Sequence, residues 1–304
     1  MVTAQSAQWS ESAVEIDGGS APLRGTIAMP PGPSPIAAVL IIAGSGPTDR
    51  DGNQPGLRND SLKLLARGLA GRGIASLRID KRGIAASAES MGSERELRFG
   101  TYVRDAAAWV GFLRTQGRVR NVFLLGHSEG ALVATLAAQQ ARVDGLILIE
   151  GLGFPAGAIL RRQLDASGLT PSLRASAETI IASLEHGQPV TDAPSELAAL
   201  FRLSVQPYLI SWLPLDPAAE LAKVTAPTLV LQGTTDIQVS VENGERLRAA
   251  RSAVDLVVLD GVNDVLKEAG PDRIRNIATY SDPTLPLAPS VLPSIEAFVR
   301  KNRP

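Results

Sequence analysis

The stretch "NVFLLGHSEGALVATLAAQQA", residues 121–141, decides the fold. Its first part, "NVFLLG" (121–126), is a continuous apolar run, which is typical of a strand buried on both faces of a sheet. Its last part, "EGALVATLAAQQA" (129–141), predicts a helix. Strand and helix are joined by residues 126–130, Gly-His-Ser-Glu-Gly, which fit the pattern G-x-S-x-G. The stretch therefore predicts a sharp strand-to-helix turn with Ser128 at its tip.

A serine at such a turn has a strained backbone, and the flanking glycines Gly126 and Gly130 leave room for it. The strain lifts the serine hydroxyl above the sheet, and the helix N-terminus behind it favours negative charge. The pattern alone occurs often by chance, but its place between a buried strand and a helix makes it specific. We therefore predict that Ser128 is a nucleophile; the alternative is an ordinary turn.

Strand-like and helix-like segments alternate on both sides of this turn. Residues 12–18 and 23–30 read as an antiparallel pair joined at Gly18-Gly19. Further strands are expected at 36–44, 74–80, 143–151, 226–233 and 254–261, and helices at 59–71, 101–116, 241–250 and 290–302. Asn59 or Asp60 is the expected cap of the first helix. Such alternation predicts an α/β fold, a mostly parallel sheet with helices on both faces.

Residues 154–222 contain helical pieces and no strand-like run. A helical insertion between two strands of such a sheet is most simply a cap over the carboxyl edge, where ligands bind. We therefore predict a core formed by residues 1–153 and 223–304, and a cap formed by residues 154–222.

The loop after the strand at 36–44 begins with Gly44-Ser45-Gly46. In an enzyme with a serine at this turn, that loop supplies one backbone N–H to an oxyanion hole, and the residue after the nucleophile supplies the other. These donors would be Ser45 and Glu129; the alternative is a glycine-rich turn. The following residues 49–51, Asp-Arg-Asp, are expected to form ion pairs that fix the loop rather than to act in catalysis.

Two aspartates follow the last two expected strands. Asp236 lies just past the strand at 226–233, where the chain order Ser…Asp…His places the acid of a triad; the alternative is a helix cap. Asp264 lies just past the strand at 254–261, in "GVNDVLK" (261–267). The chain has only two histidines, His127 and His186.

These motifs, in this order, resemble the α/β-hydrolases of the serine-aminopeptidase and lysophospholipase-like branch, and in particular the EstD-type carboxylesterases. The resemblance rests on "AGSGPTDRDGN" (43–53), "DKRGIAAS" (80–87), "GHSEGA" (126–131), "GTTDIQV" (233–239) and "GVNDVLK" (261–267), and is vaguest in the cap. It implies an α/β-hydrolase fold with a mostly parallel eight-stranded sheet and a helical cap.

The resemblance also implies an activity, the hydrolysis of carboxylic esters with small or medium acyl groups, without metal or organic cofactor. Ser128 would be the nucleophile, Asp236 the acid, and Ser45 and Glu129 the oxyanion donors. Aromatic residues and leucines of the cap, among them Phe154, Phe201, Tyr208 and Trp212, would form its internal core, and some would line an apolar acyl pocket.

The chain departs from the family at Asp264, because the family pattern is G-x-N-H and this chain has Gly-Val-Asn-Asp. An aspartate is a weaker base than histidine by about 2.6 pKa units, and its shorter side chain leaves a gap to the Ser128 hydroxyl. With Asp236 close by, the two carboxyl groups would share a proton. His127 is expected to point into the surrounding loops and His186 to lie exposed in the cap, so neither is expected to act as the base.

Three hypotheses for Asp264 remain open. In the first, Asp264 is an engineered or accidental replacement of the histidine in an ordinary esterase, which keeps only slow turnover. In the second, Asp264 is native and acts as a carboxylate base. In the third, the fold has lost hydrolysis and serves to bind a small ligand or to run non-hydrolytic chemistry.

Composition limits the other functions. Of the 304 residues 44% are hydrophobic and 20% charged, and the formal net charge is −1, so nothing favours a nucleic-acid or membrane-surface partner. The absence of cysteine excludes disulfides and cysteine-bound metals. No stretch is long and apolar enough to span a bilayer. The polar N-terminal segment predicts a cytoplasmic protein, or an exported one whose signal has been removed. The expected partner is a small-molecule ester, and the oligomeric state stays undetermined.

Overall fold

The computed structural model describes residues 9–303. The first eight residues, which form part of the segment used above to predict localisation, lie outside the described residues. Within 9–303, no helix is both long and apolar enough to cross a membrane.

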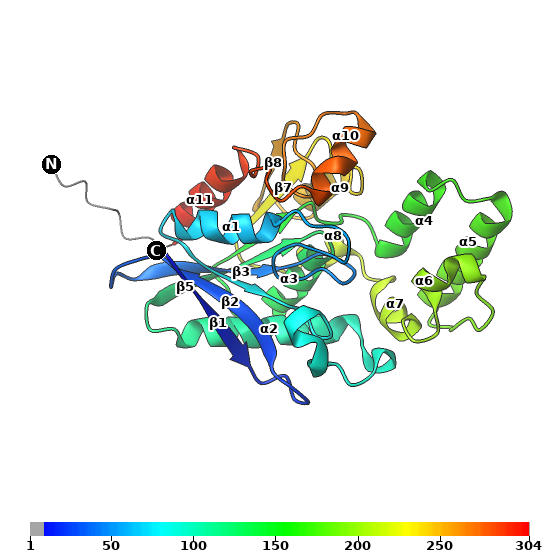
Figure 1. The fold of residues 1–304 in the computed structure, drawn as a ribbon, viewed down its shortest axis with the longest axis horizontal. Helices are drawn as coiled ribbons and strands as arrows, with labels where there is room; N and C mark the ends of the chain where they lie inside the picture. Colours follow the sequence, from blue (N-terminus) through cyan, green and yellow to red (C-terminus); the bar gives the residue numbers. More distant parts are fainter. Residues whose placement is uncertain (1–8, 304) are drawn as a thin grey trace.

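Eight strands form one sheet in the order β1-β2-β4-β3-β5-β6-β7-β8 (Figure 1). The first two strands and β4 pair antiparallel, and all other pairs are parallel. The predicted mostly parallel, eight-stranded sheet is confirmed. The strands are β1 (Ser10–Ile16), β2 (Leu23–Met29), β3 (Ile36–Ile42), β4 (Ala75–Ile79), β5 (Val119–His127), β6 (Gly145–Ile149), β7 (Thr228–Gly233) and β8 (Val254–Leu259).

Helices cover both faces of this sheet (Figure 1). Leu65 of α1 and Ile295 of α11 pack in one apolar cluster, whereas Trp109 of α2 and Leu132 of α3 pack in another. Every residue of β3 is buried, as a strand with two covered faces requires. The helices of this core are α1 (Ser61–Ala70), α2 (Phe99–Thr115), α3 (Glu129–Gln140), α8 (Pro217–Leu221), α9 (Val241–Ala249), α10 (Arg273–Ala278) and α11 (Val291–Lys301).

The chain between β6 and β7 is helical, as predicted, and contains no strand. Figure 1 shows α4 (Ala156–Ala166), α5 (Pro171–Glu185), α6 (Ala198–Phe201) and α7 (Gln206–Trp212) gathered to one side of the sheet. In contrast, α8 contacts α3 and α9. The bounds of a separate cap at residues 154–222 stay a prediction.

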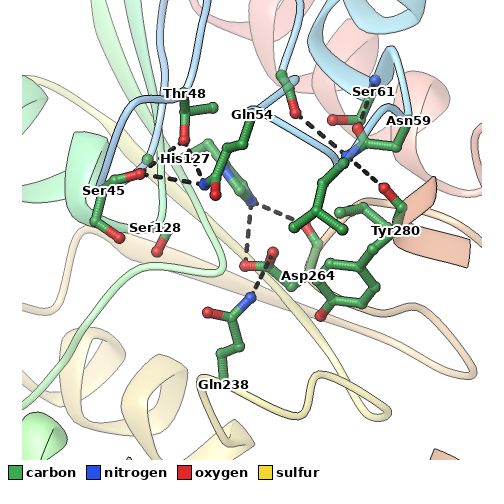
Figure 2. Close-up of a pocket in the computed structure, with 14 residues that line it drawn as sticks. Ser45, Thr48, Gln54, Asn59, Ser61, His127, Ser128, Gln238, Asp264 and Tyr280 are labelled. Carbon is green, nitrogen blue, oxygen red and sulfur yellow. Dashed lines mark hydrogen bonds and ion pairs between the residues drawn. The ribbon is translucent and has the colours of Figure 1, made fainter. Parts of the chain in front are cut away.

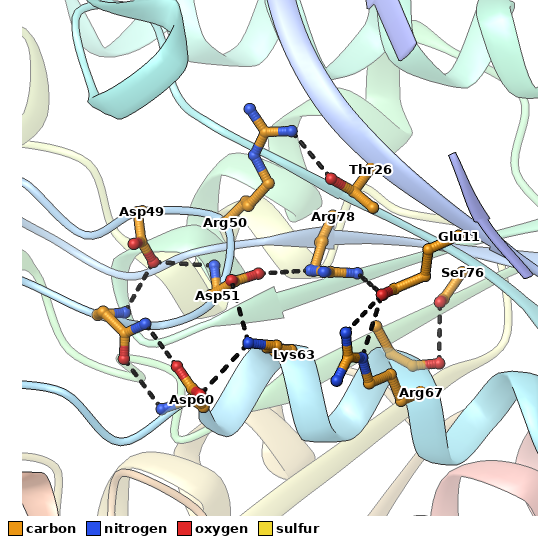
Figure 3. Close-up of polar contacts among 12 residues, drawn as sticks. Glu11, Thr26, Asp49, Arg50, Asp51, Asp60, Lys63, Arg67, Ser76 and Arg78 are labelled. Carbon is orange, nitrogen blue, oxygen red and sulfur yellow. Dashed lines mark hydrogen bonds and ion pairs between the residues drawn. The ribbon is translucent and has the colours of Figure 1, made fainter. Parts of the chain in front are cut away.

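Charged side chains fix the loop that follows β3 (Figure 3). Arg50 donates to Asp80 at the end of β4 over 3.0 Å from Nε and 2.5 Å from Nη2. Buried Arg78 of β4 donates to Asp51 and to Glu11 of β1, over 2.6 Å in each case. The predicted ion pairs are confirmed for Arg50 and Asp51, whereas Asp49 accepts hydrogen bonds from the N–H groups of Asp51 and Asn53. These contacts hold the loop beside the carboxyl edge of the sheet.

The start of α1 differs from the expected capping. Asp60 is the residue before the helix, but its φ is +53° and its side chain accepts no capping hydrogen bond. The Asn59 side chain instead accepts from the N–H of Ser61 over 2.9 Å, and Asp60 binds Asn53, Arg58 and Lys63. The Asp60 carboxylate, which the sequence pattern offered as a helix cap, therefore binds side chains of the loop and of α1 instead.

Candidate active site

Ser128 lies at the tip of a strained turn between β5 and α3. Its φ and ψ are +52° and −120°, a region that costs a non-glycine residue on the order of 1–3 kcal/mol. Its N–H donates to the Ile149 carbonyl at the end of β6 over 2.9 Å. The neighbouring strand therefore holds the strained residue in place.

The two glycines of the turn allow the close approach of three backbone segments. A Cβ at Gly126 would lie 2.1 Å from the Gly130 carbonyl oxygen, and a Cβ at Gly130 would lie 2.4 Å from the Ile42 carbonyl oxygen of β3. Both positions tolerate only hydrogen, so G-x-S-x-G is here a steric requirement of the turn.

The loop after β3 lies directly against this turn. A Cβ at Gly44 would lie 3.1 Å from the Ser128 Cβ. Among the described residues, the backbone N–H groups of Ser45 and Glu129 have no hydrogen-bond acceptor. Two unused donors beside a strained serine suit the predicted oxyanion hole.

Two cavities meet at Ser128. The larger has a volume of about 290 Å³, and its wall includes the polar side chains of Thr48, Gln54, Asn59 and Tyr280 as well as apolar ones (Figure 2). The smaller has a volume of about 80 Å³ and lies under the α4 and α7 helices; its apolar wall includes Leu152, Ile159, Leu160 and Trp212. Ser45, Ser128 and Gln238 line both cavities.

The cap aromatics divide between the two expected roles. Phe201 and Tyr208 are buried, and Trp212 stacks on Phe99 with ring centroids 6.1 Å apart while also lining the smaller cavity. Phe154 is half-buried and lies 4.8 Å from the guanidinium of Arg246. Of the four, only Trp212 lines a cavity at Ser128, the smaller one.

Asp264 lines the larger cavity and is held by two neighbours (Figure 2). His127 donates from Nε2 to the Asp264 backbone carbonyl over 2.8 Å and lies 3.4 Å from its carboxylate, and Gln238 donates to the other carboxylate oxygen over 3.0 Å. The hydroxyl of Ser128 has no hydrogen-bond partner among the described residues, consistent with the expected gap between the serine and a short carboxylate.

His127 is buried and points to the segment that carries Asp264, as expected. Burial is the largest single effect and lowers the pKa of His127, but the charge of Asp264 and the hydrogen bonds with Asp264 together outweigh it and raise the pKa. Because Nε2 already donates to Asp264, His127 is poorly placed to take a proton from Ser128. His186 is exposed at the end of α5, as expected.

Asp236 fixes the loop after β7 by hydrogen bonds and interacts electrostatically with Asp264. Its Oδ1 accepts from the N–H groups of Gln238 and Val239 over 2.6 and 3.0 Å, whereas its Oδ2 is buried without a hydrogen-bonding N–H or hydroxyl partner. Burial and the charge of Asp264 raise the pKa of Asp236 to about 7. The two aspartates predicted to interact are therefore electrostatically coupled.

Glu150 was missed in the sequence analysis. It ends the β6 run "LILIE" fully buried, with φ at +49°, and its carboxyl group accepts from the N–H of Gly233 over 2.9 Å. Burial and the charge of the neighbouring Asp236 raise the pKa of Glu150 well above its usual range. The sequence signal that could have identified Glu150 is an acidic residue directly after an apolar strand.

A metal site is not evident. Among residues 9–303, no group of three or more histidine, aspartate or glutamate side chains is arranged to hold a metal ion.

The sheet order, the strained serine turn and the helical insertion are those of the α/β-hydrolase fold, which solved structures share with this chain. Residues 60–192 match the family described as serine aminopeptidase, S33. A curated relative is the esterase EstD of Thermotoga maritima, which is 27% identical over 256 residues; these cover 80% of this chain and 58% of EstD. The chain therefore spans little more than half the length of that relative.

Solved structures share the fold. Est1E from Butyrivibrio proteoclasticus, solved with ferulic acid bound, superposes with a TM-score of 0.63 at 18% identity, covering 95% of this chain and 98% of Est1E. A hypothetical protein from Pseudomonas aeruginosa superposes with a TM-score of 0.65 at 16% identity, covering 98% of this chain and 95% of that one. At such identities the likeness establishes the fold alone.

Proposed function

We propose that this chain is a carboxylesterase-type serine hydrolase that cleaves carboxylic esters with small or medium acyl groups through an acyl-enzyme on Ser128. The observation that carries the proposal is the strained backbone of Ser128 at the meeting point of two cavities. The distant relation to the esterase EstD points to the same activity.

In this proposal the Ser128 hydroxyl attacks the ester carbonyl carbon and its proton passes to Asp264. The oxygen that becomes negative receives hydrogen bonds from the backbone N–H groups of Ser45 and Glu129. The alcohol leaves with the proton, and water then cleaves the acyl-enzyme. Asp236 lies beside Asp264, and burial together with the charge of Asp264 raises the pKa of Asp236.

The cavities suggest how an ester would be divided. The small cavity under α4 and α7 has leucine and isoleucine side chains in its wall and suits a short acyl chain. The larger cavity, with hydroxyl and amide side chains in its wall, suits the alcohol portion. No cofactor is needed for this chemistry. An aspartate base makes turnover slow, because it accepts the serine proton less readily than an imidazole.

The direct test is hydrolysis of p-nitrophenyl acetate and butyrate by the parent protein and by Ser128→Ala. We expect slow, saturable hydrolysis by the parent and at least about a 100-fold loss in Ser128→Ala. Equal rates of hydrolysis for the two proteins would show that Ser128 takes no part in the reaction and would contradict the proposal.

A second candidate, a ligand-binding protein that has lost hydrolysis, is favoured by one observation: Asp264 is already bound by His127 and Gln238, and Ser128 has no base in hydrogen-bond contact. This alternative predicts that a fluorophosphonate fails to label Ser128 and that butyrate or a similar small acid raises the melting temperature saturably. Covalent labelling of Ser128 would exclude it.

A further inference from the structure

Lys81 is a buried cation behind the candidate oxyanion hole. It is the second residue after β4, in "DKRG" (80–83), and only 5% of its surface is exposed. A buried ammonium group is costly unless it is paired and hydrogen-bonded. The groups that bind the Lys81 ammonium group therefore indicate its role.

Those partners belong to the two segments that carry the candidate oxyanion donors. The Lys81 ammonium group donates to the backbone carbonyl of Gly44 and lies 3.4 Å from the Oε1 of buried Glu129. It also lies 5.2 Å from the centre of the Tyr102 ring, a favourable cation–π position. Lys81 thus connects the loop after β3 with the first residue of α3.

The contact with Gly44 has a specific chemical consequence. The carbonyl of Gly44 and the N–H of Ser45 belong to the same peptide group. A cation that binds the carbonyl oxygen draws electron density toward it and makes the N–H of that peptide a stronger donor, since linked hydrogen bonds polarise one another. The N–H of Ser45 has no acceptor among the described residues, so this added donor strength is available to a ligand.

We propose that Lys81 is a positioning residue that polarises the Gly44–Ser45 peptide and so strengthens one donor of the oxyanion hole, with the buried Glu129 carboxylate balancing its charge. This inference rests on the proposed function. Lys81 touches neither the substrate nor Ser128; it acts through the Gly44–Ser45 peptide. The alternative is a structural role, in which Lys81 only balances the buried charge of Glu129.

The test compares Lys81→Met with the parent by two readouts. In the ¹⁵N-labelled full chain, we expect the Ser45 amide proton resonance to move upfield, because the peptide loses its cation. On p-nitrophenyl butyrate we expect kcat to fall about 10-fold with KM almost unchanged, a part of the roughly 10²- to 10³-fold loss that removal of a whole donor causes. Lys81→Gln keeps a hydrogen-bond donor but loses the charge. Its Ser45 resonance and its kcat should therefore lie between those of the parent and those of Lys81→Met.

The control is Lys223→Met, which removes a lysine that also binds a glutamate, Glu220 over 2.7 Å, on the exposed surface. It should change neither readout. If Lys81→Met fails to fold because Glu129 is left unpaired, the double variant Lys81→Met with Glu129→Gln removes both buried charges and takes its place.

An unchanged Ser45 resonance, or an unchanged kcat, in a folded Lys81 variant overturns the inference. Failure of the proposed function is distinguished by Ser128→Ala: if that variant hydrolyses the ester as fast as the parent, the esterase mechanism falls. The Ser45 resonance then still decides whether Lys81 polarises the peptide.

Discussion

Three carboxyl groups gather at the ends of three adjacent strands: Glu150 after β6, Asp236 after β7 and Asp264 after β8. Glu150 and Asp236 have raised pKa values in the folded protein. At a pH between the unfolded and the folded pKa, each therefore holds a proton in the folded protein that it would lose in the unfolded chain. Such groups give stability that is complete below their unfolded pKa and is lost as the pH rises through the folded pKa. For Asp236 this loss extends from about pH 4 to the folded pKa of about 7.

We therefore expect Glu150→Gln to flatten the dependence of stability on pH. Glutamine keeps hydrogen-bonding groups at this buried position but cannot ionise. Melting temperatures measured at pH 5 and pH 8 should differ less in the variant than in the parent. The exposed substitution Glu245→Gln should leave the parent difference intact. A variant with the same or a larger drop between pH 5 and pH 8 would contradict the assignment of a buried, protonated Glu150.

At the scale of elements, the turn between β5 and α3 depends on backbone contacts that only glycine permits. The Cβ of an alanine at position 130 would lie 2.4 Å from the backbone of β3, with no flexible side chain able to yield. In α2, by contrast, a Cβ at Gly111 would meet nothing within 4 Å.

Gly130→Ala should consequently destabilise the protein by about 3 kcal/mol, since β3 or α3 must move. Gly111→Ala should stabilise it by up to about 1 kcal/mol, because alanine is the better helix former. Urea unfolding of both variants measures the difference. A similar free energy of unfolding for the two would show that the turn does not require its second glycine.

The elements were the most predictable part of the chain. All eight strands were expected within a few residues of their observed bounds. The central parallel strands were recognisable as continuous apolar runs, and β1 and β2 as a pair of strand-like segments around a Gly-Gly turn. Periodic apolar stripes likewise indicated α1, α2, α3, α9 and α11. The short helix α10 was missed, since six residues with exposed Ile274 and Ile277 carry no amphipathic pattern.

The candidate site was predictable only where a residue directly follows a strand in a known motif. Ser128 and the Gly44–Ser45 loop could be found in this way, because strand ends share one edge of the sheet. The roles of Lys81, His127 and Glu150 could not, because they depend on contacts between residues 37 to 137 positions apart in the sequence. Such contacts exist only after the sheet order is set.

At the scale of the whole molecule, the helices between β6 and β7 close one side of the site. Leu160 of α4 lines the small apolar cavity beside Ser128, whereas Leu200 of α6 is exposed. If this cavity holds the acyl chain, its size sets the longest ester that fits.

Leu160→Ala should then shift the preference from acetate toward hexanoate esters by about 10-fold in the ratio of kcat/KM. The comparison of p-nitrophenyl acetate with p-nitrophenyl hexanoate measures it, with Leu200→Ala as the control that leaves the ratio unchanged. An unchanged ratio in Leu160→Ala would place the acyl chain elsewhere, in the larger cavity.

The fold thus brings a serine hydroxyl, two candidate oxyanion donors and a carboxylate to one edge of the sheet, and the central claim is that Asp264 occupies the position of a catalytic imidazole. Asp264→His tests it most directly, assayed on p-nitrophenyl butyrate from pH 5 to pH 9. We predict a gain in kcat of about 100-fold or more near neutral pH, with a loss below about pH 6.5 that the slow parent does not share. A histidine variant no faster than the parent at any pH would contradict the claim.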